Sequence, residues 1–300
     1  MDDQAAALRE IIEESRDSGK RAQRVITLVP VGINAHIDDF AANFALAVAD
    51  EDKKTLVIDT RDDTARILKL LKIARADEME LLFSGEKRME ELARISFDKR
   101  LRYINARSAI FEMSRGSSQS WMKKAMDKFF ACCEDYEAIV FISGGFETND
   151  QKSMIYAGGD CVAVMCDDNS SIVECFKLCR AAGRAGDISV AINNAKDRAA
   201  AITTVQNFKV ITRRQLGEAP ELFGIVRVDD MSQKAFCAEE TYYSAYPASD
   251  ATKDMQSMVN IYLDQDRDQP ELLRSYIRKA GRVFAPETDD GNSQEDYGKQ

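Results

Sequence analysis

The sequence predicts an α/β fold, a doubly wound and mostly parallel sheet of about seven strands with helices on both faces. Three observations support this prediction. The length of 300 residues suits one large α/β domain or two small ones, short apolar runs alternate with helical patterns, and most of those runs are continuously apolar. Continuous apolar strands are typical of a parallel sheet that is buried between two layers of helices.

The expected strands follow one another at intervals that leave room for helices between them. They are residues 25–29, 55–59, 102–105, 138–143, 161–166, 188–193 and 222–228. Helices are expected over residues 38–50, 117–133, 170–182, 196–213 and 250–263. In such sheets ligands bind beyond the carboxyl ends of the strands, here the polar segments VPVGINAHIDD, IDTRDD and ISGGFETND.

The chain divides into four expected parts. Residues 1–20 are expected to form an N-terminal helix and linker, and residues 21–268 the α/β domain. Residues 269–284 are expected to form an amphipathic helix, followed by a polar tail over 285–300 that is expected to be disordered.

Composition narrows the function classes. The formal net charge of −10 argues against a nucleic-acid partner that is bound through a broad basic face. The sequence contains no apolar run long enough to span a membrane and no secretory leader pattern, so a cytoplasmic protein is expected. The seven cysteines are expected to be buried and reduced, and with one histidine no metal site is expected.

The segment 25–48, VITLVPVGINAHIDDFAANFALAV, has the layout of a phosphate-binding loop, with a strand, a glycine-containing turn and a helix. Together with KKTLVIDT after it, this segment resembles the start of MinD/ParA-type ATPases. DQAAALR, over Asp3–Arg9, resembles the DQAxxLR motif of the FlhG (FleN/YlxH) branch, whose members regulate flagellar number and placement. YEAIVFISGG, AINNAKD and the stretch from LFGIVRVDD onward follow in the family's order, so the resemblance extends over residues 2–284.

The departures from this family fall on the nucleotide site. Its KGGVGKT motif aligns with residues 32–38, so Gly32 replaces the signature lysine, Ile37 the P-loop lysine and Asp38 the Mg²⁺-holding threonine. Ile142 takes the place of the switch II aspartate, whereas Asp59 keeps the water-positioning carboxylate.

A P-loop binds phosphate through backbone N–H groups and lysine charge, whereas Asp38 and Asp39 would repel a phosphate at this helix end. The resemblance therefore implies a pseudo-ATPase with no nucleotide cofactor. Asn193 falls beside the family's adenine site but is more simply a polar residue at a strand end. Asp59 is more simply an inherited carboxylate without chemistry, and His36 a solvent-exposed loop side chain.

The resemblance assigns the N-terminal helix a partner, an FlhF-like SRP-type GTPase whose GTP hydrolysis it would stimulate. Asp3, Gln4, Leu8 and Arg9 would make this contact. The alternative is a helix that only caps the fold.

The C-terminal helix has two interpretations that stay open. It carries apolar and basic residues at helical spacing, so it can contact a membrane surface weakly or pack on the body. The candidate membrane residues are Leu273, Arg274, Ile277, Arg278, Lys279 and Phe284. The first interpretation would place the protein peripherally at the inner membrane or a cell pole.

These features together predict a nucleotide-independent FlhG-like regulator or adaptor of flagellar number or placement. Flagellar C-ring proteins or transcription regulators are further partners that the resemblance implies. One alternative is a MinD/ParA-like pseudo-ATPase scaffold that localises a pilus, secretion or chemotaxis apparatus. A second is an active ATPase with an atypical P-loop.

Overall fold

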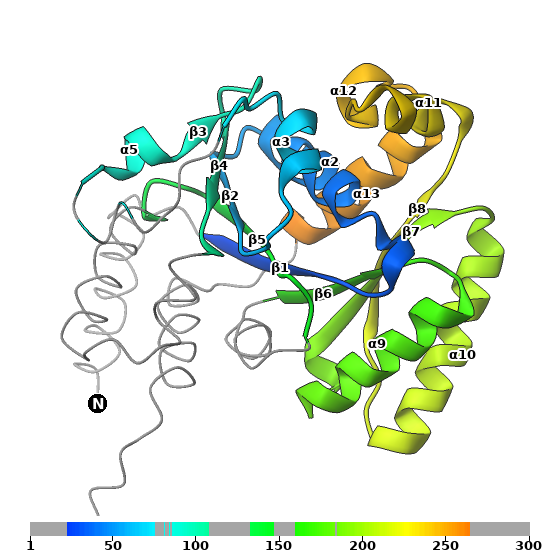
Figure 1. Ribbon diagram of the computed structural model, residues 1–300. Helices are drawn as coiled ribbons and strands as arrows, with labels where there is room; N and C mark the ends of the chain where they lie inside the picture. Colours follow the sequence, from blue (N-terminus) through cyan, green and yellow to red (C-terminus); the bar gives the residue numbers. More distant parts are fainter. Residues whose placement is uncertain are drawn as a thin grey trace, which may run out of the picture.

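The computed structural model describes residues 23–75, 81, 84, 86–107, 133–146, 160–183 and 185–264. Its strands form one sheet in the order β3-β4-β2-β5-β1-β6-β7-β8 (Figure 1). The strands are β1 (Arg24–Pro30), β2 (Thr55–Asp59), β3 (Arg94–Ile95), β4 (Leu101–Asn105), β5 (Ala138–Ile142), β6 (Asp160–Met165), β7 (Ile188–Ala195) and β8 (Glu221–Arg227). All neighbours pair in parallel except β3, which runs antiparallel to β4 at one edge.

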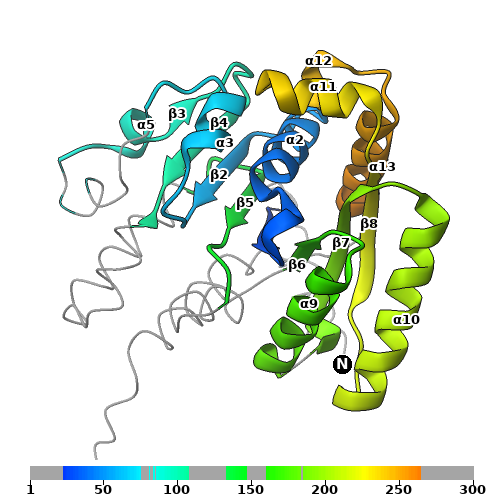
Figure 2. The same ribbon diagram turned by 45° about the vertical axis from the view of Figure 1, so that its right-hand side comes forward.

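Helices cover both faces of this sheet. One face carries α2 (Ile37–Asp50), α3 (Ala65–Leu70), α11 (Asp230–Ala238), α12 (Tyr242–Ala245) and α13 (Asp250–Asp264). The other face carries α9 (Asn169–Ala182) and α10 (Arg198–Leu216). Figure 2 shows these two groups on opposite sides of the strands. Three short elements complete the described fold, α5 (Met89–Leu92) and the 3-10 turns η1 (Ile33–Ala35) and η2 (Ala185–Asp187).

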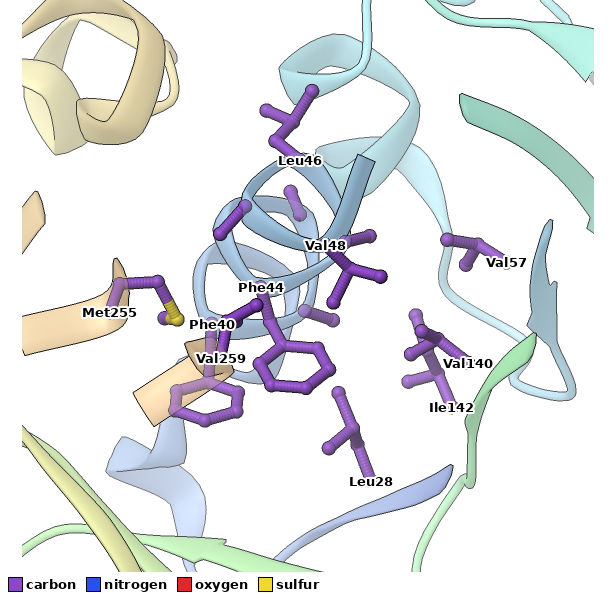
Figure 3. Packing of buried hydrophobic residues seen from close by; sticks show 14 of the residues in the cluster. Leu28, Phe40, Phe44, Leu46, Val48, Val57, Val140, Ile142, Met255 and Val259 are labelled. Carbon is purple, nitrogen blue, oxygen red and sulfur yellow. The ribbon is translucent and has the colours of Figure 1, made fainter. Parts of the chain in front are cut away.

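The helix α2 is the centre of the larger core. All its residues from Asp39 to Ala49 are buried, because sheet, α3 and α13 surround it, and this explains the apolar sequence FAANFALAVA. Figure 3 shows Phe40 and Phe44 of α2 above Leu28 of β1, with Met255 of α13 beside them. Each such side chain contributes about 2 kcal/mol through its removal from water.

The sequence predicted the fold class correctly. Each of the seven predicted strands is present, within about two residues of its expected ends. The eighth strand, β3, was not predicted because two residues carry no hydrophobic period. The four predicted helices that lie among the described residues are also present, whereas the short helices α3, α5, α11 and α12 were not predicted. The predicted helix over 117–133 lies almost entirely outside the described residues.

The cysteines that were predicted to be buried beside apolar strands are buried. Cys161 of β6 and the pair Cys175 and Cys179 of α9 face each other in the smaller core, as free thiols. Cys237 differs, because it is exposed near the end of α11. The boundaries of the predicted terminal parts, 1–20, 269–284 and 285–300, lie outside the described residues.

Candidate functional site

The candidate site lies at the carboxyl ends of the central strands, where a short loop joins β1 to α2. Gly32 opens the loop at φ +81° and ψ 159°, a conformation that favours glycine. A Cβ atom there would also lie 2.6 Å from the hydroxyl oxygen of Ser171 in α9. The loop therefore requires glycine both for its backbone angle and for the close approach of α9. Its tip places Ile33 fully in solvent and buries Ala35.

The loop is anchored through its own carbonyl groups to the ends of β6 and β7. The Asn193 amide, at 2% exposure, donates to the carbonyl oxygen of Ala35 at 3.0 Å. The Cys166 thiol donates to the carbonyl oxygen of Asn34 at 2.9 Å. Asn193 thus lies two residues before the end of β7 and makes a structural contact with the loop.

Asp168 holds the same loop from the start of α9. Its carboxylate accepts from the backbone N–H of Ser171 at 2.8 Å and also from the side chain of Asn34. The hydrogen bonds from Ser171 and Asn34 hold the pKa of Asp168 below its ordinary value, although partial burial opposes the shift. The N-cap of α9 and the loop therefore share one carboxylate.

A buried arginine links the two aspartates that the sequence singled out. Arg61 donates from Nε to Oδ1 of Asp59 at 2.9 Å and from Nη2 to Oδ2 at 2.7 Å. The same Nη2 donates to Oδ1 of Asp38 at 2.8 Å. Asp59 is 0% exposed and Arg61 9%, so this ion-pair network is largely shielded from water. One guanidinium group thereby lies between the first turn of α2 and the end of β2.

The charges of Asp59 and Asp38 keep Arg61 protonated, and Tyr103 also stays protonated. Burial alone would lower the pKa of Arg61, but hydrogen bonds and charge from Asp59 and then Asp38 outweigh it and raise the pKa. Tyr103 of β4 donates its hydroxyl to Oδ2 of Asp59 at 3.1 Å. Burial, followed by the charge of Asp59, raises the pKa of Tyr103, so its hydroxyl stays a donor. Arg61 is thus a permanent internal cation.

A second ion pair covers the start of α2. Arg66 of α3 binds Asp39 through two hydrogen bonds of 2.7 Å, and its guanidinium lies 4.0 Å from the ring centroid of Phe236 in α11. His36 packs edge-on against the same ring, with 5.1 Å between ring centroids. His36 is therefore only partly exposed, and not the fully exposed loop side chain that was expected, because α11, which was not predicted, packs against one side of it. Both carboxylates in the first turn of α2 are neutralised by arginines.

The two predicted site positions that are isoleucines belong to the core. Ile142, at the end of β5, is fully buried beside Val140 and Leu28 (Figure 3). Only its backbone reaches the site, where its carbonyl oxygen accepts from the N–H of Thr60 at 3.0 Å and from its hydroxyl at 2.9 Å. Ile37 is also buried and packs in the same cluster. Neither position offers a charged or polar side chain to a ligand.

Solved structures place this arrangement in a known fold. A MinD from Pyrococcus horikoshii OT3 complexed with Mg-ADP superposes with a TM-score of 0.59 and 13% identity, over 81% of this chain and 96% of that one. MinD in the MinC:MinD complex of Aquifex aeolicus gives 0.57 and 16%, over 81% and 97%. A ParA-family ATPase from Chlorobium tepidum TLS gives 0.59 and 15%, over 80% and 98%. The chain has the MinD/ParA fold.

The sequence searches add no relative to these structures. No protein-family model matches the sequence, and a search of curated proteins returns no match. At identities of 13–16%, the superpositions show the fold alone, and the activity has to be argued from the site.

The MinD/ParA fold brings together all six residues that were singled out for the nucleotide site. Gly32, Ile37, Asp38, Asp59, Ile142 and Asn193 lie at or next to the carboxyl ends of β1, β2, β5 and β7. The fold joins Asp38 to Asp59 through Arg61, and it joins Asn193 to the loop. Within the described part of the chain, no group of three or more metal-ligating side chains comes together.

Residues that the sequence did not single out complete the site of this MinD/ParA fold. Arg61, Arg66, Tyr103 and Phe236 contribute charges or ring contacts. The one signal available was an arginine two residues beyond the strand-final Asp59, in the IDTRDD segment. The residues predicted for partner contact, Asp3 to Arg9, and for membrane contact, Leu273 to Phe284, lie outside the described residues. None of the helices that the structure describes has both the length and the apolar character to cross a bilayer.

Proposed function

We propose that this protein is a nucleotide-independent adaptor with the MinD/ParA fold, and therefore a pseudo-ATPase. The observation that carries the proposal is Arg61, which links Asp38 and Asp59 in a network that is shielded from water. In the family that the sequence resembles, the first of these positions is a threonine that holds Mg²⁺ and the second positions the attacking water. Here the protein's own cation neutralises both.

Electrostatics supports this proposal. Phosphoryl transfer depends on positioning and on cations around the transferred phosphate, chiefly the P-loop lysine and Mg²⁺. The loop and first turn, from Gly32 to Asp39, contain no lysine or arginine. Binding of Mg²⁺ at the Asp38 position would compete with Arg61, whose Nη2 lies 2.8 Å from Oδ1 of Asp38 and 2.7 Å from Oδ2 of Asp59. ATP would have to offset the loss of this ion pair without a lysine contact.

A calorimetric titration with Mg-ATP tests this part of the proposal. We expect no saturable binding to the loop and no release of phosphate by the intact protein. A micromolar dissociation constant together with phosphate release would establish the alternative of an active ATPase with an atypical P-loop. Titration of the variant Asp59→Asn is a useful comparison, because catalysis by an atypical site would depend on this carboxylate.

The finer proposal is an FlhG-like regulator of flagellar number or placement. It rests on the DQAAALR segment, in which Asp3, Gln4, Leu8 and Arg9 would contact an FlhF-like SRP GTPase and stimulate GTP hydrolysis. A terminal peptide can act in this way even though the domain behind it binds no ATP. We expect a peptide of residues 1–20 to raise the GTPase rate of the cognate partner, and Gln4→Ala to lower that effect. A partner whose GTPase rate is unchanged by the intact protein would contradict the finer proposal.

The alternative is a MinD/ParA-like scaffold for another apparatus at the membrane or cell pole. Solved structures of similar fold include the MinC:MinD complex, in which a MinD binds a protein partner. Co-purification from the native host distinguishes the two, because the FlhG-like proposal requires the SRP-type GTPase among the retained proteins. Flotation with vesicles of the full chain and of a chain truncated after Asp268 tests the proposed weak membrane contact of Leu273 to Phe284.

A further inference from the structure

A hollow at the far edge of the sheet has the opposite chemistry to the strand-end site. It lies between the end of α3 and the β3–β4 hairpin, which stand side by side in both ribbon views (Figures 1 and 2). Its volume of about 540 Å³ falls within the range of about 300–1,000 Å³ that is usual for small-molecule sites. Lys72, Arg75, Arg94 and Arg102 line it together with a single carboxylate, Glu91.

Glu91, the carboxylate in the lining, contacts Arg88, which does not line the cavity. Glu91 accepts from the backbone N–H of Arg88 at 2.8 Å and lies 3.8 Å from the guanidinium of the same residue. Among the ion pairs of the described residues, none includes Lys72, Arg75 or Arg102. Lys72, Arg75 and Arg102 therefore bring positive charge to the cavity, and no carboxylate among the described residues forms an ion pair with these three side chains.

This charge does not belong to a generally basic surface. The chain has a formal net charge of −10, and Arg100, on the same hairpin, lies within 3.7 Å of carboxylates of Asp98, Asp50 and Asp52. Carboxylates are therefore abundant next to the cavity, whereas Glu91 is the one carboxylate among the described residues that line it. Like charges that share a hollow repel one another, and an anion that enters would relieve this repulsion.

Capping of the C-terminal end of α3 does not account for the positions of Lys72 and Arg75. Basic residues often follow a helix because they offset the dipole of its last carbonyl groups. Here backbone N–H groups already serve that purpose, since Lys72 donates to Lys69 and Ile73 donates to Leu68 at 2.8 Å. The carbonyl oxygen of Leu71 accepts from the N–H of Phe97 at 3.4 Å. The side chains of Lys72 and Arg75 are thus not needed to complete α3.

One guanidinium group in the wall is held in place. Arg102 donates from Nη1 to the carbonyl oxygen of Ala93 at 3.1 Å, and it pairs with Ile95 across the hairpin. An arginine with a fixed plane is well suited to bind phosphate oxygens through two hydrogen bonds. Lys72 adds a point charge, and its ammonium nitrogen lies 5.3 Å from the ring centroid of Phe97. The exposed Ile95 provides an apolar surface at the rim for the rest of a ligand.

We propose that this α3–β3–β4 cavity binds a small phosphate-bearing anion with two or more negative charges. Lys72, Arg75 and Arg102 supply the charge and the hydrogen-bond donors. The site is separate from the loop after β1, so it does not depend on the proposed absence of nucleotide binding there. Its ligand can be a free phosphate compound or the phosphate of a lipid headgroup, and the test distinguishes these sources.

The test compares three proteins in a calorimetric titration with inorganic pyrophosphate. The double variant Lys72→Asn/Arg75→Gln removes two exposed cations, and asparagine tolerates the positive φ of 55° at position 72. The control variant Arg214→Gln removes an exposed cation at the end of α10, which covers strands at the opposite edge of the sheet. We expect the double variant to weaken pyrophosphate binding at least tenfold and the control to change it less than twofold.

A parallel arm uses sedimentation with vesicles of phosphatidylglycerol in phosphatidylcholine. Binding of pyrophosphate that the double variant loses supports a free anion, and vesicle binding with the same loss supports a lipid headgroup. An unchanged circular dichroism spectrum and melting temperature show that the double variant is folded. The proposal is overturned if neither probe binds the wild type, or if the double variant binds as tightly as the wild type.

Discussion

The strand-end site and the α3–β3–β4 cavity differ in whether their charged side chains have partners of opposite charge within the protein. At the strand ends, Asp38 and Asp59 share Arg61, so the protein carries its own counter-charge. In the cavity, Lys72 and Arg75 have no carboxylate partner among the described residues, although Arg100 close by has three within 3.7 Å. The aspartates at the strand ends are already neutralised by Arg61, so a bound cation would bring them no further counter-charge. In the cavity, a bound anion would reduce the repulsion between the cations.

This contrast places the proposed ligand in the cavity and not at the loop after β1, which aligns with the phosphate-binding loop of the family that the sequence resembles. Beside that loop, Arg66 also covers Asp39.

Removal of Arg61 should have the largest effect. Arg61→Met leaves Asp59, which is 0% exposed, without its cation, and we expect a loss of about 3–5 kcal/mol in the free energy of unfolding. Urea denaturation followed by circular dichroism measures this loss. The double variant Asp59→Asn/Arg61→Met should recover a large part of it, because no charge is then left buried and unpaired. A single variant within about 1 kcal/mol of the wild type would contradict an essential internal cation.

Addition of a methyl group to the loop at Gly32 should cause the second-largest loss in the free energy of unfolding. Gly32→Ala requires a positive φ of 81° and brings Cβ within 2.6 Å of the Ser171 hydroxyl, so we expect a loss of about 2–3 kcal/mol. Gly183→Ala is the control for a positive φ without a clash, because its φ is +68° and nothing lies within 4 Å of the added Cβ. Its ψ of −3° differs from the 159° of Gly32, so it controls for the positive φ alone. We expect about 1 kcal/mol there, from backbone strain alone. Equal losses for both variants would show that the contact between the loop and α9 is not tight.

The ion pair that covers α2 should have a smaller effect. Arg66→Ala removes two hydrogen bonds to Asp39 and the contact with the Phe236 ring, and we expect a loss of about 2 kcal/mol. Lys69→Ala, one turn later on α3, removes an exposed pair with Glu239, and a loss of about 0.3 kcal/mol is expected. Thermal melts of both variants provide the comparison. A larger loss for Lys69→Ala would contradict the difference in burial on which the prediction depends.

Removal of charge from the cavity should have the smallest effect and the opposite sign. In a buffer without phosphate, Lys72→Asn/Arg75→Gln should leave the free energy of unfolding unchanged or raise it by about 0.5 kcal/mol, because like charges no longer repel. The same urea titration in phosphate buffer should reverse the order, since the anion stabilises only the wild type. A clear destabilisation in both buffers would mean that these side chains support the fold.

The sequence predicts the sheet better than it predicts the site, for a physical reason. Strands such as Ala138–Ile142 are continuously apolar because both faces are covered, and this signal is local. The departures at Gly32, Ile37 and Asp38 are local too, since they follow from one loop. The partner of Asp38, however, lies 23 residues later and reaches it only in the folded chain.

Local sequence patterns could not predict the cavity or the packing of His36 either, because both depend on contacts between elements that are distant in the sequence. The cavity cations come from α3, β3 and β4, so no spacing in the sequence brings Lys72 and Arg102 together. The helix α11 that covers His36 is short and exposes Phe236 on one side, so its apolar stripe was too weak to predict.

The most direct test of the central claim is the unfolding free energy of the cavity variant Lys72→Asn/Arg75→Gln with and without Mg-ATP. This variant removes the second place where a phosphate compound would bind, so any remaining stabilisation reports on the loop after β1. We predict that millimolar Mg-ATP leaves its free energy of unfolding unchanged. Stabilisation by about 2.7 kcal/mol, the value for a ligand at one hundred times its dissociation constant, would show that nucleotide displaces Arg61 and would contradict the account.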